Sequence, residues 1–379
     1  MIVKHTNNRT PLSLLGVDSY EDLQKIDWSS LSASDLTKSR LTSAQDIALF
    51  LNNVYIPKDP KFKVAVNPYQ LSLMDKDDVN CPIRLQYLPS HHEEEQMDFT
   101  LLDELGEEHD TIPGTSIVHR YPQRVLFLVS NQCQAYCRFC TRKRMVGVPS
   151  EMVHMNEIEA SINYIANNTS IQDVLLSGGD PLMFRDEKLD YILSQIRKRA
   201  PHVMFLRIGS RMVVQNPLRI TKDLCDVLER NDVNMLNIHI NHPKEITPLL
   251  KEKCRLLSKS VMLGCQTVCL KGINDKVEIL RDLFMKCLSM KVRPYYVYST
   301  DMVEGAHQFI VSYKRMLELY EGLRGWISGP AIPTFVVDGL GGLGKMPIIP
   351  TYVTQEDGTV KCRNFENKTV EMPALYEPV

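Results

Sequence analysis

The fold is decided by the stretch Val125-Leu126-Phe127-Leu128-Val129-Ser130-Asn131-Gln132-Cys133-Gln134-Ala135-Tyr136-Cys137-Arg138-Phe139-Cys140. Its first five residues are apolar, which predicts a buried strand. Three cysteines follow with the spacing C-x3-C-x2-C, on the loop that leaves this strand. Thiolates are the usual ligands of iron-sulfur clusters, and a compact cysteine run can hold several irons of one 4Fe-4S cube. Because three thiolates leave one iron of a cube without a protein ligand, that iron can take a chelating group from outside the protein.

A structural zinc site and three unrelated cysteines are the alternatives for this loop. Zinc requires four ligands, commonly two C-x2-C pairs or a Cys/His set. The nearest histidines are His119 and His154, which lie well outside the loop. The strand before the cysteines and a glycine motif further along favour the iron-sulfur cluster, because independent features then agree.

The overall composition limits the classes of function. A chain of 379 residues is expected to form one large domain or two modest ones. With 44 basic and 46 acidic residues, it has no basic field for nucleic acid and no polybasic membrane patch. Residues 1–8 are too polar for a signal peptide, and no apolar run reaches membrane-spanning length. We therefore expect the ten cysteines to be thiols and metal ligands in a reducing cytoplasm.

Short apolar runs alternate with helix-like segments from residue 125 onward. The runs lie at 125–130, 173–177, 203–209, 235–240, 261–268 and 292–298. Helix-like segments include Glu187 to Arg199 and Lys222 to Arg230. This alternation predicts an α/β fold with a parallel sheet, a partial (βα)6 TIM-like barrel. In such barrels the chemistry lies at the C-terminal ends of the strands.

The polar and glycine motifs follow the ends of these predicted strands. In strand order they are the cysteine loop, Gly178-Gly179-Asp180, Arg207 to Arg211, His239 to His242, Gln266, and Tyr295 to Asp301. We therefore expect them on one rim of the barrel. Glycines in such a turn let the backbone approach a ligand closely, although a tight βα turn alone would also explain them.

The remaining segments flank the predicted barrel of residues 119–300. Residues 1–118 are expected to be mainly helical, with helices near 41–51, where Ser43 is the N-cap, and near 67–74. The acidic stretch from Glu93 to Asp110 is interpreted as a solvated surface segment. Residues 301–379 form the predicted C-terminal extension, with a helix at 311–323 and short strands at 360–363 and 368–370.

A glycine-rich loop in this extension ends at Lys345. The loop is not a phosphate-cradling P-loop, because Met346 occupies the place of the required Ser or Thr. A lysine beside an apolar strand can have its pKa lowered by desolvation and form a Schiff base with pyridoxal phosphate (PLP). An ordinary surface lysine is the alternative.

Taken in order, the motifs resemble those of the lysine 2,3-aminomutase family, a PLP-dependent branch of the radical S-adenosylmethionine enzymes. The resemblance covers roughly residues 57–373. It rests on His119 to Arg124, Cys137 to Arg144, Leu176 to Asp180, Asn241 to Pro243, Gly272 to Asp275, Arg293 to Tyr296, Glu321 to Gly325 and Pro333 to Lys345.

The resemblance implies a role for each matching residue. Cys133, Cys137 and Cys140 would hold the 4Fe-4S cluster, and Lys345 would be the catalytic residue that bonds to PLP. The other cofactor-binding candidates are Ser177, Gly178, Gly179 and Asp180 in the S-adenosylmethionine motif, Arg120 and Arg124 near the PLP phosphate, and Tyr121 and Gln266. Arg142 would clamp the substrate α-carboxylate, and Asp301 and Asp338 would bind the other end of the substrate. An ion pair on the barrel rim is the alternative for each arginine, and a turn cap is the alternative for Asp338.

The implied activity is that of an isomerase which interconverts L-lysine and L-β-lysine. Two carboxylates at one end of the pocket would attract a lysine side chain and repel glutamate. The alternatives are an aminomutase that acts on arginine, ornithine or glutamate, a supplier of β-lysine for elongation-factor modification, and a non-catalytic iron-sulfur or zinc-binding interaction protein. We expect an electron donor such as flavodoxin or ferredoxin. Zinc is not expected, because Lys276 stands where relatives with a zinc-bearing C-terminal extension have a cysteine, and a homo-oligomer is left open.

Overall fold

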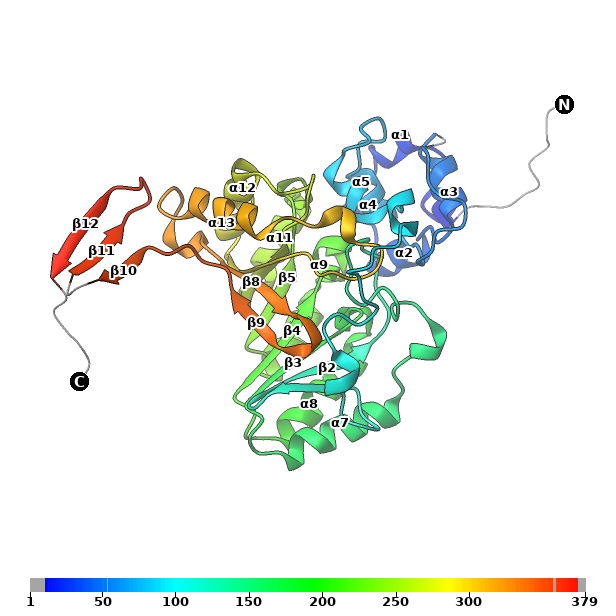
Figure 1. Ribbon diagram of the computed structural model, residues 1–379. Helices are drawn as coiled ribbons and strands as arrows, with labels where there is room; N and C mark the ends of the chain where they lie inside the picture. The colour runs from blue at the N-terminus through cyan, green and yellow to red at the C-terminus, as the bar shows by residue number, and fades with distance from the viewer. Residues whose placement is uncertain (1–10, 53, 357–358, 374–379) are drawn as a thin grey trace.

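A nine-stranded sheet forms the centre of the computed structural model, which describes residues 11–52, 54–356 and 359–373 (Figure 1). The strands are β1 (Ile117–Tyr121), β2 (Arg124–Ser130), β3 (Asp173–Gly178), β4 (Phe205–Ser210), β5 (Met235–His239), β6 (Met262–Val268), β7 (Val292–Tyr298), β8 (Thr334–Gly339) and β9 (Gly344–Pro347). They are ordered along the sheet as along the chain. Strands β2 to β8 are parallel, and β1 and β9 are antiparallel strands at the two edges. The polar N-terminal residues 1–8 lie outside the described residues.

The predicted partial barrel is confirmed. The six predicted runs form β2 to β7, and β8 adds a seventh parallel strand from the predicted extension. Because β1 begins at Ile117 and β8 at Thr334, the sheet continues across both predicted segment boundaries, 118/119 and 300/301. The three-part division of the chain stays a prediction.

Amphipathic helices follow the parallel strands and cover the sheet. They are α7 (Met155–Asn167), α8 (Asp186–Arg199), α10 (Lys222–Arg230), α11 (Pro248–Leu257), α12 (Val277–Ser289) and α13 (Tyr313–Leu323). Helix α10 shows why these segments are helical. Thr221 accepts the N–H of Leu224 and so begins the helix, and Leu224, Val227 and Leu228 bury one face. That face packs into a core that includes Leu206 of β4.

The N-terminal part consists of short helices with a separate hydrophobic core. They are α1 (Tyr20–Leu23), α2 (Ala33–Lys38), α3 (Ala44–Phe50), α4 (Pro68–Ser72) and α5 (Pro82–Tyr87). Ser43 caps α3 as predicted, because its side chain accepts the N–H of Asp46. Asn67 caps α4 in the same way. Leu23, Ile47 and Leu71 lie in the core that joins these helices.

The prediction that the acidic stretch is solvated was wrong for three of its residues. Glu93 is 1% exposed, Glu104 6% and Glu107 5%. Glu93 lies in the short 3-10 helix η3 (His91–Glu94) and Glu107 in α6 (Glu107–Asp110). Arginines from the cysteine loop and the residues just after it pair with two of these acids, and that pairing is what permits their burial.

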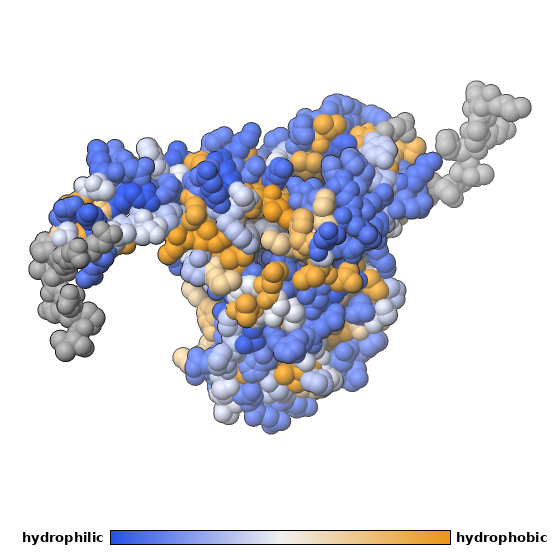
Figure 2. Space-filling model, viewed as in Figure 1, coloured by the Kyte–Doolittle hydropathy of each residue, from blue (hydrophilic) through white to orange (hydrophobic). Residues whose placement is uncertain are grey.

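The C-terminal part ends in a small antiparallel sheet that projects from the barrel (Figure 1). Its strands are β10 (Val353–Glu356), β11 (Thr359–Arg363) and β12 (Thr369–Pro373), close to the predicted short strands. Figure 2 shows hydrophobic residues gathered across the middle of the visible face, between this sheet and the N-terminal helices. Among the described residues, each helix is too short or too polar to cross a lipid bilayer.

Candidate active site

A cavity of about 340 Å³ is lined by the parallel strands and by the loops that follow them. Every predicted site residue lines it, in chain order Arg120, Tyr121, Arg124, Cys133, Cys137, Cys140, Arg142, Ser177, Gly178, Gly179, Asp180, Gln266, Asp301, Asp338 and Lys345. The structure therefore brings the predicted residues together around one cavity. Those that follow the parallel strands lie at the C-terminal ends, as the barrel rule requires, whereas Arg124 begins β2, and Arg120 and Tyr121 lie in β1 beside it.

The cysteine loop is held against the end of β3 through the two glycines. The N–H of Gly179 donates to the carbonyl of Ser130, and the N–H of Asp180 donates to Gln132 at 2.8 Å. Gly178 has φ +122°, and a Cβ atom on it would lie 2.2 Å from the Ser130 carbonyl oxygen. Only glycine fits this position without strain. The glycines are thus required to pack the two loops together, in addition to any contact with a ligand.

Asp180 organises the loop that follows β4. Its carboxylate is buried and accepts hydrogen bonds from the Ser210 hydroxyl at 2.8 Å and from the N–H groups of Arg211 and Met212, both at 2.8 Å. Burial raises the pKa of Asp180, and these donors oppose that rise. Its carboxylate oxygens accept hydrogen bonds from protein groups, so the geometry fits a residue that positions the loop after β4.

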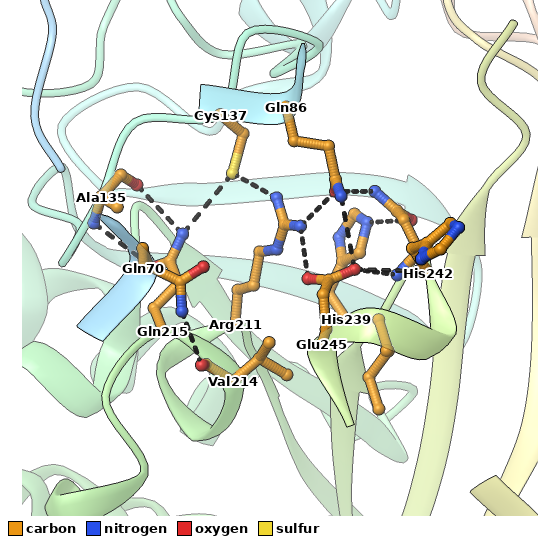
Figure 3. Close-up of polar contacts among 12 residues, drawn as sticks. Gln70, Gln86, Ala135, Cys137, Arg211, Val214, Gln215, His239, His242 and Glu245 are labelled. Carbon is orange, nitrogen blue, oxygen red and sulfur yellow. Dashed lines mark hydrogen bonds and ion pairs between the residues drawn. The ribbon is translucent and has the colours of Figure 1, made fainter. Parts of the chain in front are cut away.

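Arg211 was expected on the barrel rim, as the last residue of the motif Arg207 to Arg211, but was not given a role in the site. Its guanidinium lies between Cys137 on one side and Gln86 and Glu245 on the other (Figure 3). The Nη1–Sγ distance to Cys137 is 2.7 Å, and an Nη2–Oε2 distance of 2.9 Å joins Arg211 to Glu245 of the 3-10 helix η7 (Pro243–Glu245). Its position directly after the third predicted strand was the signal in the sequence that could have identified it as a site residue.

The three thiols suit a cationic metal cluster. All ten cysteines are free thiols, and none of the three loop cysteines is consumed in a disulfide. Burial raises the pKa of Cys133 and of Cys140, and the neighbouring Cys137 raises both further. Anionic sulfurs in this place therefore require a cationic partner, which iron supplies. Arg211 and Gln215 donate to the Cys137 sulfur, as expected around an iron-sulfur cluster.

Lys345 is presented to the cavity by the last hairpin of the sheet. Lys345 pairs with Asp338 across β8 and β9, and its Nζ lies 2.8 Å from Asp338 Oδ1. Its backbone N–H donates to the Tyr121 hydroxyl at 2.9 Å. The guanidinium of Arg124 lies over the Tyr121 ring, 4.0 Å from the ring centroid. The amine of Lys345 fits the aldehyde of PLP, and the guanidinium of Arg124 beside the Tyr121 ring fits the phosphate of PLP.

Arg120, the second predicted phosphate ligand, is already paired in the protein. Its Nε donates to Asp110 Oδ2 of α6 at 2.7 Å, and Nη2 donates to the carbonyl of Leu105. The ion-pair alternative is thus realised for Arg120, while its side chain still lines the cavity.

Arg142 makes a bidentate ion pair with a residue that sequence reasoning missed. Its Nε and Nη2 donate to the two carboxylate oxygens of Glu107, the first at 2.8 Å. Burial by itself raises the pKa of Glu107, but the charge and hydrogen bonds of Arg142, together with the charges of Arg144 and Arg120, lower it below its ordinary value. Arg142 also lies 3.4 Å from the Gly178 carbonyl. The ion-pair alternative is thus realised for Arg142, while its Nη1 is directed at the glycine loop and its side chain lines the cavity.

Acidic groups converge at one end of the cavity. Asp301 follows β7, and Asp338 is the penultimate residue of β8. The pKa of Asp301 is raised well above its ordinary value by burial, by Glu104 and by Asp338, although Lys345 opposes the rise. Buried carboxyls that repel one another are stabilised by a bound cation.

Comparison with known proteins identifies the same family as the motifs. The pattern of the radical SAM superfamily matches residues 127–280, and that of lysine-2,3-aminomutase matches residues 320–375. The L-lysine 2,3-aminomutase of Fusobacterium nucleatum is 43% identical over 87% of this chain and 79% of its own length. The enzyme of the same name from Clostridium subterminale is 43% identical over 83% of this chain and 76% of its own. The glutamate 2,3-aminomutase of Clostridioides difficile is 42% identical over 82% and 74%.

These matches cover the cysteine loop, the barrel and the C-terminal hairpin together, and the barrel and cavity agree with them. The cofactors of this family are a 4Fe-4S cluster, S-adenosylmethionine and PLP, and the relatives are isomerases. The chain therefore belongs to the lysine 2,3-aminomutase family of radical S-adenosylmethionine enzymes.

Proposed function

We propose that this enzyme interconverts L-lysine and L-β-lysine by migration of the α-amino group to the β-carbon. Family membership does not choose the substrate, because one relative at 42% identity acts on glutamate. The observation that carries the proposal is the pair of carboxyls, Asp301 and Asp338, at one end of the cavity. This end attracts an ammonium group and repels a second carboxylate.

The residues of the chain would bind the substrate at both ends. When bound, the cluster, S-adenosylmethionine and PLP supply the radical chemistry and the electron delocalisation. Arg142 would hold the substrate α-carboxylate through Nη1, because its Nε and Nη2 are bonded to Glu107, and Asp301 and Asp338 would hold the ε-ammonium group. Lys345 would bind PLP, and its hydrogen bond to Asp338 positions the amine at the cavity. Fixing both ends of the substrate places the β-carbon in one position.

Incubation of the anaerobically reconstituted enzyme with lysine, arginine, ornithine and glutamate tests the proposal. β-Lysine is expected as the main product. Formation of β-glutamate without β-lysine would overturn the substrate assignment, and preferential turnover of arginine or ornithine would move it to that amino acid. Asp301→Asn and Asp338→Asn should each raise KM for lysine by about tenfold or more, since each removes one charge from the cation subsite.

The setting of the reaction follows from the same chemistry. We expect a cytoplasmic enzyme that receives its electron from a flavodoxin or ferredoxin. Supply of β-lysine for elongation-factor modification uses the same reaction and differs only in the fate of the product. Reduction of the cluster by each purified donor, followed by β-lysine formation, tests the donor.

A further inference from the structure

Glu104 lies between the two loops that carry the acidic residues of the cavity. Its backbone carbonyl accepts the N–H of Gly341 at 3.0 Å, in the loop that follows Asp338. Three residues earlier, the N–H of Leu101 donates to the carbonyl of Met302 at 2.9 Å, next to Asp301. Leu101 and Val303 form a parallel bridge. The segment 101–104 is therefore held against both loops.

The carboxyl group of Glu104 is buried and incompletely satisfied. The side chain is 6% exposed, and Oε2 has no hydrogen-bond partner among the described residues. Burial raises the pKa of Glu104 to about 7, with an opposing hydrogen bond from the Met302 N–H and a further increase from Asp338. Glu104 in turn raises the pKa of Asp301. An unpaired buried carboxyl is costly, so a structural role alone does not account for it.

The groups that face Glu104 and its two acidic neighbours come from several elements. Lys345 of β9 carries positive charge but is bonded to Asp338. Glu107 of α6 acts on Asp301, Tyr298 of β7 is near Asp338, and Tyr313 of α13 is influenced by both Glu104 and Asp301. Three carboxyls thus share the single ammonium group of Lys345 in this set. The local charge balance is restored either by protons or by a cationic ligand.

We propose that Glu104 is a positioning residue of the substrate-cation subsite, which keeps a proton in the free enzyme and releases it to solvent when a cationic amino-acid side chain binds beside Asp301 and Asp338. The inference rests on the proposed function and deepens it. Glu104 is not among the described residues that line the cavity, whereas Asp301 and Asp338 are. It therefore acts on the subsite through charge: Asp338 raises the pKa of Glu104, and Glu104 raises the pKa of Asp301. A neutral substrate side chain would not favour ionisation of Glu104, so Glu104 makes the subsite prefer a cationic side chain over a neutral one.

The proposal predicts how lysine affinity depends on pH. Below pH 7 the substrate must displace the proton, so KM for lysine should rise up to about tenfold per pH unit while kcat changes little. Glu104→Gln keeps the shape and removes the titration. Its KM should be about tenfold higher than that of the wild type at pH 8 and nearly constant from pH 6 to 8. Glu104→Asp should restore part of the pH dependence.

Steady-state kinetics of the anaerobic holoenzyme from pH 6 to 9 tests this, with Glu108→Gln as the matched control. Glu108 is an acidic residue four positions further along the chain, in α6, and its side chain is 78% exposed. Calorimetric titration with lysine at pH 6.5, in two buffers of different ionisation enthalpy, counts the protons released. The wild type should release up to about one proton more than Glu104→Gln, because all contributions from lysine itself and from PLP are common to both.

The outcomes separate this inference from the proposed function. Equal proton release and equal pH dependence of KM in wild type and Glu104→Gln would overturn the role of Glu104. A variant that loses iron and kcat equally at every pH, with the KM profile unchanged, would also overturn it, because that pattern indicates a structural role. Absence of β-lysine formation by the wild type would refute the proposed function. The proton count with arginine or ornithine would then decide the role of Glu104 independently.

Discussion

The buried ion pair between Arg138 and Glu93 should control whether the cysteine loop can hold its cluster. Arg138 lies between Cys137 and Cys140, and its side chain is 2% exposed. Its Nε donates to Glu93 Oε1 at 2.8 Å, a second hydrogen bond joins Nη2 to the other oxygen, and Nη1 donates to the Lys63 carbonyl at 2.8 Å. Replacement of Glu93 by Gln leaves the guanidinium buried without its counter-charge.

The loss of stability expected for Glu93→Gln follows from this geometry. Removing one partner of a buried ion pair costs about 3–5 kcal/mol. Gln can retain one of the two hydrogen bonds, so we expect a value of about 3 kcal/mol, which is a large share of the 5–15 kcal/mol typical of a folded protein. Because Arg138 is two residues from Cys140, part of this loss should appear as reduced iron binding after reconstitution.

Urea denaturation of the apoprotein, followed by circular dichroism, measures the free energy of unfolding, and iron analysis measures cluster content. Glu94→Gln is the control, since Glu94 is the exposed neighbour in η3 and should change stability by less than about 0.5 kcal/mol. The double variant Glu93→Met/Arg138→Met should recover much of the loss, because it removes both buried charges. A loss below about 1 kcal/mol in Glu93→Gln, or iron binding equal to that of the control, would refute the reasoning.

Three further predictions concern single residues. Gly178→Ala should destabilise the protein by at least about 2 kcal/mol in chemical denaturation, because its φ is +122° and the new methyl group would lie 2.2 Å from the Ser130 oxygen. Gly272→Ala is the control for backbone strain alone, because φ is also positive there but nothing lies within 4 Å of the added Cβ. Lys345→Ala should lose PLP on gel filtration and abolish turnover, and retention of full activity would contradict the assignment of the PLP lysine. Burial lowers the pKa of His242 to about 4, so the folded protein binds fewer protons than the unfolded chain between pH 4 and 6.5. The free energy of unfolding should therefore fall by at most about 3 kcal/mol as the pH drops through this range. Denaturation at several pH values measures this fall, and His242→Asn should flatten that part of the curve.

Much of the site could be predicted because its signals are local. The strand–loop order, the cysteine spacing, the glycine pair and the lysine loop each occupy a few consecutive residues, and the barrel rule places all strand ends on one rim. Arg142 and Arg120 show what the sequence could not predict. Their type and position indicate anion binding, but the acids that engage them, Glu107 and Asp110, lie on a helix that only the folded chain brings to the cavity.

By itself, the sequence determined the positions of six of the seven parallel strands and the family, and it predicts the cluster ligands, because hydrophobic periodicity and motif spacing are properties of short segments. Only the tertiary structure decided which acidic residues are solvated. Glu93 and Glu94 are adjacent in the chain, yet one is buried against Arg138, 45 residues away, and the other faces solvent. The charge and burial of a side chain depend on its neighbours in space, and for Glu93, Glu104 and Glu107 those neighbours come from distant parts of the chain.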